Sequence, residues 1–333
     1  MAIARSLPSD FKYTDPFFQT GMMESIAQFT DGFNAASANA IRLVPNIMTG
    51  DYGKRAFNKI VASATTRRDI TSIAAVESLK FTQDEEISVK LHRKFGPVAY
   101  TLTALRHSGI TRDAMNRFAG QQFGEEKVQQ HLNAAIIAVE AAIEGQTTAL
   151  TYDATGQSTK TLLTEYLAAG LQKMGDHANR VRAWVMHSKP FYDLVKSQIT
   201  TTGTVFSGFS AVINAATPAS LGRPVIVTDA SALTDANGSL TDTYNILGLV
   251  EDAVVIEESE EEIVQISDPL TGFENIHIDV QAEYAFNVSC KGFKYNTSGG
   301  GANPTDGTLG TTSNWTQAAT ADKHLAGIRI IVQ

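Results

Sequence analysis

The residues of this chain that could do chemistry fall short of each motif they approach. Thr155–Thr161, TGQSTKT, is close to a phosphate-binding loop. That loop needs a glycine directly before Lys-Thr, so that bare backbone can wrap the phosphate, but Thr159 stands there. Gly208–Val212, GFSAV, is close to the nucleophile elbow Gly-x-Ser-x-Gly, but Val212 replaces the second glycine. No Gly-x-Gly-x-x-Gly stretch is present for a dinucleotide. We therefore predict no catalytic residue and no cofactor.

Metal binding and acid–base chemistry have equally little support. No two histidines are spaced two or four residues apart, as a local zinc site would require; the histidines are residues 92, 107, 131, 177, 187, 277 and 324. Cys290 is the only cysteine, so neither a disulfide framework nor a thiolate metal site is expected. The acidic run Glu257–Glu262 is predicted to form a solvated or intersubunit acidic face rather than a catalytic pair.

Length, composition and charge are those of a globular protein. The chain has 333 residues, 43% of them hydrophobic, which is enough for two domains or one elongated body. It has neither an apolar run of roughly 18 residues for a membrane helix nor an apolar secretory core near Met1, which predicts cytoplasmic synthesis.

Charge is distributed unevenly along the chain. Residues 1–110 hold 13 Lys and Arg against 10 Asp and Glu, whereas residues 183–333 hold 7 against 17. The acidic half argues against a nucleic-acid-reading module. The asymmetry fits a basic front that meets the acidic back of a neighbouring copy, or two solvated surfaces without a partner.

One long helix is predicted over residues 111–144. Thr111 can cap its start and Gly145 follows its end, while Gly120 and Gly124 weaken its first half and favour a kink there. Unbroken, it would span roughly 50 Å. Steps of three and four place one set of apolar residues on a single face: Val128, Leu132, Ile136, Val139 and Ile143.

One long strand is predicted over residues 276–288. At about 3.3 Å per residue it would reach roughly 43 Å, about twice the usual strand length. A helix and a strand of similar reach indicate an extended spine, which suits a flat tile better than a compact enzyme. One face of the strand is formed by alternate residues: Ile276, Ile278, Val280, Ala282, Tyr284, Phe286 and Val288.

The first 97 residues predict two extended parts. Residues 1–50 are interrupted by Pro and Gly and read as an arm, whose phenylalanines need a surface to lie on: Phe11, Phe17, Phe18, Phe29 and Phe33. Residues 51–97 predict a two-stranded excursion, because alternation around Ile87–Leu91 indicates a strand and Asn58–Thr66 is a possible partner. Arg67 and Arg68 lie between them and predict a polar tip.

The remaining elements alternate between helix and strand. They are a helix near Lys160–Lys173, a strand Ala183–His187 leading into a helix with Pro190, a strand Val225–Val227, a hairpin of Tyr244–Val250 with Ala253–Glu257 turning at Glu251-Asp252, a loop Ser298–Thr312, and a final strand Gly327–Val332.

Two blocks of sequence resemble a known family. RAWVMHSKPFYDLVK (Arg182–Lys196) and LGRPVIVTDA (Leu221–Ala230) give a strand, a small polar turn, a helix ending in Leu-x-x-Lys, then Leu-Gly-x-Pro-Val and a strand. This order resembles the A-domain of tailed-bacteriophage major capsid proteins with the Hong Kong 97-type fold. YAFNVSCKGFKY (Tyr284–Tyr295), followed by Asn303–Asp306, Asn314-Trp315 and Lys323-His324, resembles the C-terminal ends of such coat proteins.

The resemblance implies an α+β fold of the Hong Kong 97 type and a division of the chain. The implied parts are an N-terminal arm (1–50), an E-loop hairpin (51–97), a P-domain with the spine helix (98–146), an α/β A-domain (147–258), long P-domain return strands (259–292) and a C-terminal segment (293–333).

The resemblance also implies a function. A coat protein is structural and not an enzyme: hexamers and pentamers of it self-assemble into the icosahedral head shell that encloses the dsDNA genome, in the virion. Implied partners are other copies, DNA contacted without sequence specificity, and separate scaffold, portal and decoration proteins. Two alternatives stay open, namely an encapsulin-like nanocompartment shell and a soluble cytoplasmic enzyme with a cleft in residues 147–258. The candidate intersubunit contacts are the five arm phenylalanines with Lys59, Arg67, Arg68, Lys90, Glu257, Glu258, Glu260, Glu261 and Glu262.

Overall fold

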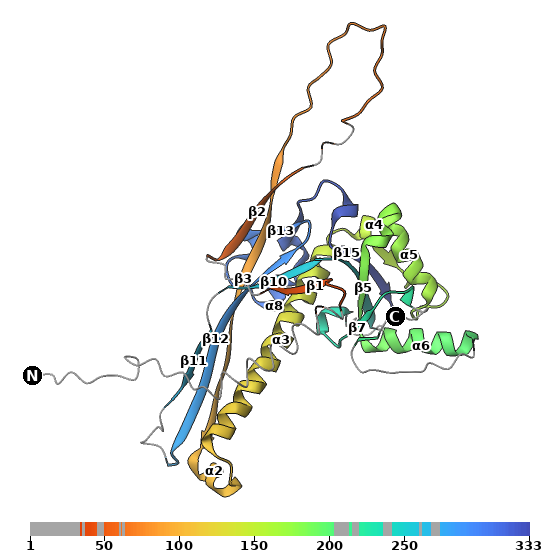
Figure 1. Ribbon diagram of the computed structural model, residues 1–333. Helices are drawn as coiled ribbons and strands as arrows, with labels where there is room; N and C mark the ends of the chain where they lie inside the picture. Colours follow the sequence, from red (N-terminus) through yellow and green to blue (C-terminus); the bar gives the residue numbers. More distant parts are fainter. Residues whose placement is uncertain are drawn as a thin grey trace, which may run out of the picture.

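Two β-sheets organise the protein, and one long helix contacts both of them (Figure 1). The computed structural model describes residues 34, 37–44, 50–59, 61, 64–202, 213–214, 220–235, 242–259, 262–267 and 274–333. The first sheet has six strands in the order β1-β10-β12-β3-β2, with β11 added to β12. Its strands are β1 (Ile41–Val44), β2 (Tyr52–Asn58), β3 (Gln83–Thr101), β10 (Val254–Glu258), β11 (Ile263–Ile266) and β12 (His277–Cys290).

The spine of the molecule consists of β3, β12 and the helix α3 (Arg112–Glu144). β12 and β3 pair antiparallel from His277–Thr101 to Val288–Val89. The predicted apolar face of β12 is buried from Ile278 to Val288, but Ile276, before the strand, is 44% exposed. The predicted helix is also confirmed: the Thr111 hydroxyl accepts a hydrogen bond from Ala114 N, and Gly145 follows the last turn. α3 continues through both internal glycines as one helix.

Burial along α3 changes where the two sheets meet. In its first half a single stripe is buried against the six-stranded sheet, and it includes Asn116, Phe123, Lys127 and His131. From Ala134 to Ile143 nearly every side chain is buried, because this half contacts both sheets. The predicted face therefore holds only in the second half, since Val128 and Leu132 are half-buried.

The second sheet has seven strands in the order β4-β15-β9-β5-β7-β6, with β8 paired to β9. Trp184 is fully buried at its centre and donates its indole N–H to Ser220 O at 3.1 Å. The strands are β4 (Thr151–Asp153), β5 (Val181–Met186), β6 (Ile213–Asn214), β7 (Val225–Val227), β8 (Thr234–Asp235), β9 (Thr243–Val250) and β15 (Gly327–Val332). The accompanying helices are α4 (Thr147–Leu150), α5 (Thr164–Met174) and α6 (Ser188–Thr202).

The predicted hairpin of β9 with β10 is wrong. β9 pairs with β5 and β15 in the seven-stranded sheet, whereas β10 pairs with β1 and β12 in the six-stranded sheet. The turn at Glu251-Asp252 is present, but it directs the chain from one sheet into the other. Both strands are buried on both faces, which is typical of internal strands with partners on each side rather than of an isolated pair.

The predicted loop Ser298–Thr312 is wrong at two places. α7 (Thr297–Gly300) and α8 (Asp306–Leu309) are single turns, and the side chains of Asn296 and Thr305 accept hydrogen bonds from the first backbone amides of each. The two strands of a small sheet flank this segment: β13 (Phe293–Tyr295) precedes it and β14 (Trp315–Gln317) follows it. At the other end of the spine, α2 (Leu102–Ser108) links β3 to α3.

Alanine at Gly327 will destabilise the seven-stranded sheet. A Cβ there would lie 2.2 Å from Gly248 O, a backbone atom that cannot move without disturbing the β9–β15 ladder. We expect a loss of about 2–3 kcal/mol in urea unfolding. Gly156→Ala is the matched control, because nothing lies within 4 Å of its added methyl group. Equal stability of the two variants would contradict the packing argument.

Candidate assembly surface

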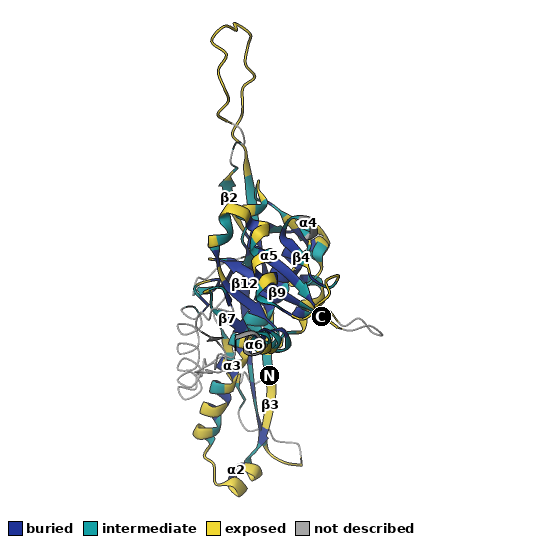
Figure 2. Cartoon of the chain, turned by 90° about the vertical axis from the view of Figure 1, so that its right-hand side faces the viewer, coloured by how far each residue is buried: buried dark blue, intermediate teal, exposed yellow. Residues whose placement is uncertain are grey.

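The four most exposed large apolar side chains among the described residues lie on one loop, and Leu79 lies on it as well. This is the β2–β3 loop, whose described residues 64–82 project far from the body (Figures 1 and 2). Arg67 and Arg68 are exposed on it as predicted, but the loop also exposes apolar side chains that were not predicted. The apolar side chains and their exposures are Ile70 (85%), Ile73 (104%), Val76 (90%), Leu79 (61%) and Phe81 (88%). Exposed apolar patches of this kind mark sites where a protein interacts with another molecule.

The stem of this loop is a regular antiparallel ladder. Tyr52–Asn58 pairs with Gln83–Val89, so the predicted partner strand Asn58–Thr66 is wrong except for its first residue. The predicted strand therefore begins at Asn58, the last residue of β2 in the observed ladder. One further backbone hydrogen bond, from Lys59 N to Thr82 O at 2.8 Å, follows the Asn58–Gln83 pair at the start of the loop.

Ion pairs fasten the stem to the body. Asp84 binds Lys59 Nζ at 2.7 Å and Lys294 Nζ at 3.3 Å, which connects both sides of the stem to β13. The hydrogen bond from Lys59 is the main reason why the pKa of Asp84 falls to about 2. Glu86 accepts from Gly292 N at 2.8 Å. The stem is therefore held in place, while the apolar residues beyond it reach away from the subunit.

The acidic run meets a buried lysine on α3. Lys127 is 3% exposed and binds Glu258 Oε1 at 2.8 Å and also Glu262 Oε1, with its ammonium 5.8 Å from the centre of the Tyr284 ring. Glu257, in turn, forms an ion pair with Arg55 of β2. These three carboxylates bind partners within their own subunit. Of the three, Glu258 has the most exposed side chain, at 39%.

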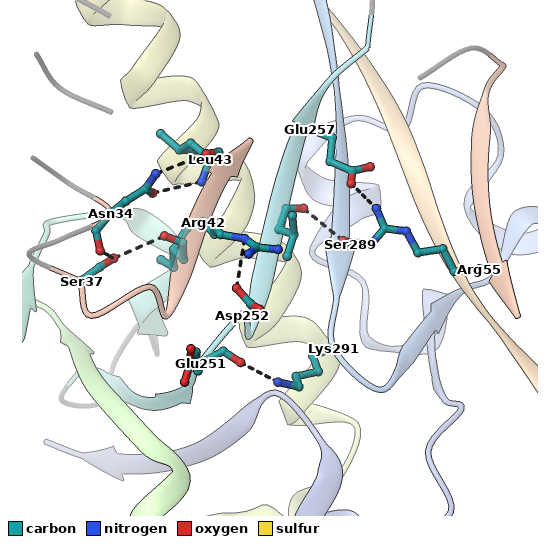
Figure 3. A network of polar contacts seen from close by, with 12 residues as sticks. Asn34, Ser37, Arg42, Leu43, Arg55, Glu251, Asp252, Glu257, Ser289 and Lys291 are labelled. Carbon is teal, nitrogen blue, oxygen red and sulfur yellow. Dashed lines mark hydrogen bonds and ion pairs between the residues drawn. The ribbon is translucent and has the colours of Figure 1, made fainter. Parts of the chain in front are cut away.

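A second polar network fixes β1 to the sheet (Figure 3). The Asn34 side chain accepts from Leu43 N at 3.1 Å and donates to Leu43 O at 3.3 Å. Arg42 Nε lies 3.1 Å from Asp252 Oδ1, and Lys291 donates to Glu251 O at 2.6 Å. Residues 41–44 are therefore part of the body, parallel to β10.

The described residues offer little for catalysis. They include no group of three or more His, Cys, Asp or Glu that could hold a metal ion. The pKa of His131 falls to about 3, because the residue is buried and Lys127 is nearby, and its ring packs 4.3 Å from that of Phe286. Burial raises the pKa of the Cys290 thiol. None of the helices within the described ranges has the length and apolar character to cross a membrane.

Comparison with known proteins shows which family the chain belongs to. The model of a family described as major capsid protein 13-like matches residues 10–329. The chain belongs to this family. It is a structural major capsid protein of a tailed phage and not an enzyme. As a virion component it self-assembles into a shell.

Solved phage structures share the fold of this capsid protein. The Cyanophage Pam1 capsid asymmetric unit aligns with a TM-score of 0.54 and 11% identity, over 89% of this chain and 91% of that one. A protein of Microbacterium phage Oxtober96 gives 0.51 and 14%, over 77% and 84%. One of Mycobacterium phage Adephagia gives 0.50 and 11%, over 90% and 89%. No curated protein sequence matches the chain. The predicted Hong Kong 97-type fold is confirmed.

The predicted contact residues fall into three groups in the capsid protein. Arg67 and Arg68 are exposed on the β2–β3 loop, and Lys59 stands at its start. Lys90 is buried in β3, at 3% exposure, and Glu257, Glu258 and Glu262 form the ion pairs described above. Glu260 and Glu261 lie outside the described residues. The five arm phenylalanines lie outside them too: Phe11, Phe17, Phe18, Phe29 and Phe33.

Sequence reasoning missed the apolar loop residues and Lys127. Ile70, Ile73, Val76 and Leu79 recur every third residue, a period of neither a half-buried strand nor an amphipathic helix. For Lys127 a signal did exist. It lies four residues after Phe123 and four before His131, on the stripe that faces the sheet.

Proposed function

We propose that the capsid protein closes its shell by laying the β2–β3 loop over an adjacent copy. The observation that carries the proposal is the set of five large apolar side chains exposed on that loop. Covering one such side chain fully is worth about 1.5–3 kcal/mol. Each contact can be weak, because a closed shell repeats it in every subunit and the repeated contacts reinforce one another.

The arm is the second proposed contact. Its five phenylalanines are too many for a segment without a core, so they would lie on the same or a neighbouring subunit and add to the loop contact. Arg67, Arg68 and the partly exposed Glu258 would lie at the rim of these contacts between copies. Charges there steer assembly more than they stabilise it.

The proposed content of the shell is a dsDNA genome. A net charge of −8 suits a wall that encloses DNA without gripping it. Hexamers and pentamers would be made in the host cytoplasm, with separate scaffold, portal and decoration proteins. An encapsulin-like compartment is the alternative, and the content of purified particles distinguishes the two. Co-purified DNA supports the phage head, whereas a co-purified cargo protein supports the compartment.

Deleting residues 2–35 tests the arm. We expect the full chain to form closed particles in negative-stain images and the truncated chain to form few or none, because the phenylalanine contacts are lost. Circular dichroism of both proteins controls for folding. Normal shells from the truncated chain would remove the arm from the assembly mechanism and leave the loop contact untouched.

A further inference from the structure

A buried arginine joins the spine helix to the seven-stranded sheet. Arg329, in β15, is 3% exposed, and its Nε lies 3.3 Å from Glu140 Oε1 and 3.1 Å from Asn245 Oδ1. One terminal nitrogen lies 3.1 Å from Glu144 Oε1, and the other lies 3.4 Å from Asp235 Oδ2. Glu140 and Glu144 belong to α3, Asn245 to β9 and Asp235 to β8. One guanidinium thus connects the helix to three strands of the sheet.

Hydrogen bonds complete the cluster. Asn245, which is fully buried, donates its amide nitrogen to Glu140 Oε1 at 3.2 Å and to Asp235 Oδ2 at 3.2 Å. Thr312 donates its hydroxyl to Glu144 Oε2 at 2.8 Å, which adds the C-terminal segment to the joint. Apart from the bond from Arg329 Nε to Asn245 Oδ1, these donors point at carboxylates, so the arrangement depends on how many of those carboxylates carry charge.

The cluster holds more negative than positive groups. One guanidinium faces three carboxylates, and the remaining polar partners, Asn245 and Thr312, do not titrate. Glu140 is the most buried of the three acids, with a side chain 10% exposed against 39% for Glu144 and 57% for Asp235. A buried carboxylate beside two others is the one that most readily keeps a proton.

We propose that the Arg329 cluster is a proton-operated joint, which holds the C-terminal end of the spine helix against the seven-stranded sheet while Glu140 is protonated and loosens when that proton leaves. The joint lies where α3 passes from one sheet to the other, so a change there alters how the two halves of the subunit are held together. The proposal concerns the subunit and does not depend on which surfaces form the shell.

The charges around Glu140 support a pH range in which the joint would respond. Burial raises the pKa of Glu140 to about 7; Arg329 opposes the rise, while Glu144 and Asp235 add to it. The folded pKa therefore exceeds the ordinary value of 4.5 for a glutamate. Stability from this group is fully present below pH 4.5 and is lost as the pH rises through about 7. The joint is held in mildly acidic solution and loosens in mildly alkaline solution.

Hydrogen exchange of the purified full-length protein tests the joint. After correction for the intrinsic effect of pH, we expect the amides of α3 from residue 136 to 144 and those of β15 to lose protection from pH 6 to pH 8. In Glu140→Gln, which mimics the protonated acid, protection at pH 8 will equal that of the original protein at pH 6. Glu125→Gln, an exposed position on the same helix, is the control and will keep the pH response.

Asp235→Asn provides a readout that does not disturb the core. Removing this half-exposed carboxylate takes away one group that raises the pKa of Glu140, so the midpoint of the pH response will move to lower pH. Protection that is independent of pH in the original protein would overturn the proposal. A Glu140→Gln protein that keeps the response, or a midpoint that Asp235→Asn leaves unmoved, would do the same.

Discussion

Aspartate in place of Ile73 will prevent shell formation and leave the subunit folded. The Ile73 side chain is fully exposed at 104%, so the substitution removes no contact within the subunit. In the proposed shell the same position is covered by a neighbour, and an unpaired carboxylate buried there costs several kcal/mol in every copy. We expect subunits or small oligomers in light scattering and no closed particles in electron micrographs.

Ser72→Asp is the matched control for this experiment. It places the same charge on the adjacent residue of the same loop and keeps all five apolar side chains. The Ser72 hydroxyl accepts a hydrogen bond from Ala74 N at 3.2 Å, and an aspartate can accept it as well. Shells from Ser72→Asp but not from Ile73→Asp will show that apolar burial, and not loop charge, governs assembly. Normal shells from Ile73→Asp would contradict the assembly mechanism.

Alanine in place of Lys127 will be the most destabilising change among the ion pairs of the spine. Lys127 is 3% exposed and compensates two carboxylates, so its loss leaves Glu258 and Glu262 facing each other beside the Tyr284 ring. Breaking a buried pair costs about 3–5 kcal/mol, and partial exposure of both acids favours the lower end. Urea unfolding of the unassembled subunit measures the loss.

Two further variants make the Lys127 result specific. Lys94→Ala removes an exposed lysine of β3 and will change stability by no more than about 0.5 kcal/mol. Glu258→Gln removes the more exposed of the two acids and will cost less than Lys127→Ala, because Glu262 still pairs with the lysine. Equal stability of Lys127→Ala and Lys94→Ala would contradict the role given to the buried cluster.

Helices and strands whose apolar residues recur with one clear spacing could be predicted from the sequence. α3 begins after Thr111 and ends before Gly145 because a capping hydroxyl and a glycine stand at those positions. Apolar and polar residues alternate along most of β12, so its face toward α3 is readable without the partner strand. The turn at Glu251-Asp252 was readable too, but its flanking strands enter different sheets, and local pattern does not reveal which distant strand supplies each ladder.

The candidate surface was harder to predict for a physical reason. Helical and strand periods record burial within one chain, whereas Ile70, Ile73 and Val76 lie beyond the subunit's own core. Lys127 pairs with a carboxylate 131 positions away, a contact that only the folded spine brings together. The resemblance to phage coat proteins, by contrast, depended on the order of elements along the chain, and that order survives even at 11–14% identity.

In the proposed shell, the β2–β3 loop of each copy is covered by its neighbour. A cryo-electron microscopy reconstruction of particles formed by the purified protein tests this arrangement most directly. We expect icosahedral shells with density of a neighbouring subunit against Ile70, Ile73, Val76, Leu79 and Phe81. Shells in which these side chains face solvent, or small oligomers under every assembly condition, would contradict it.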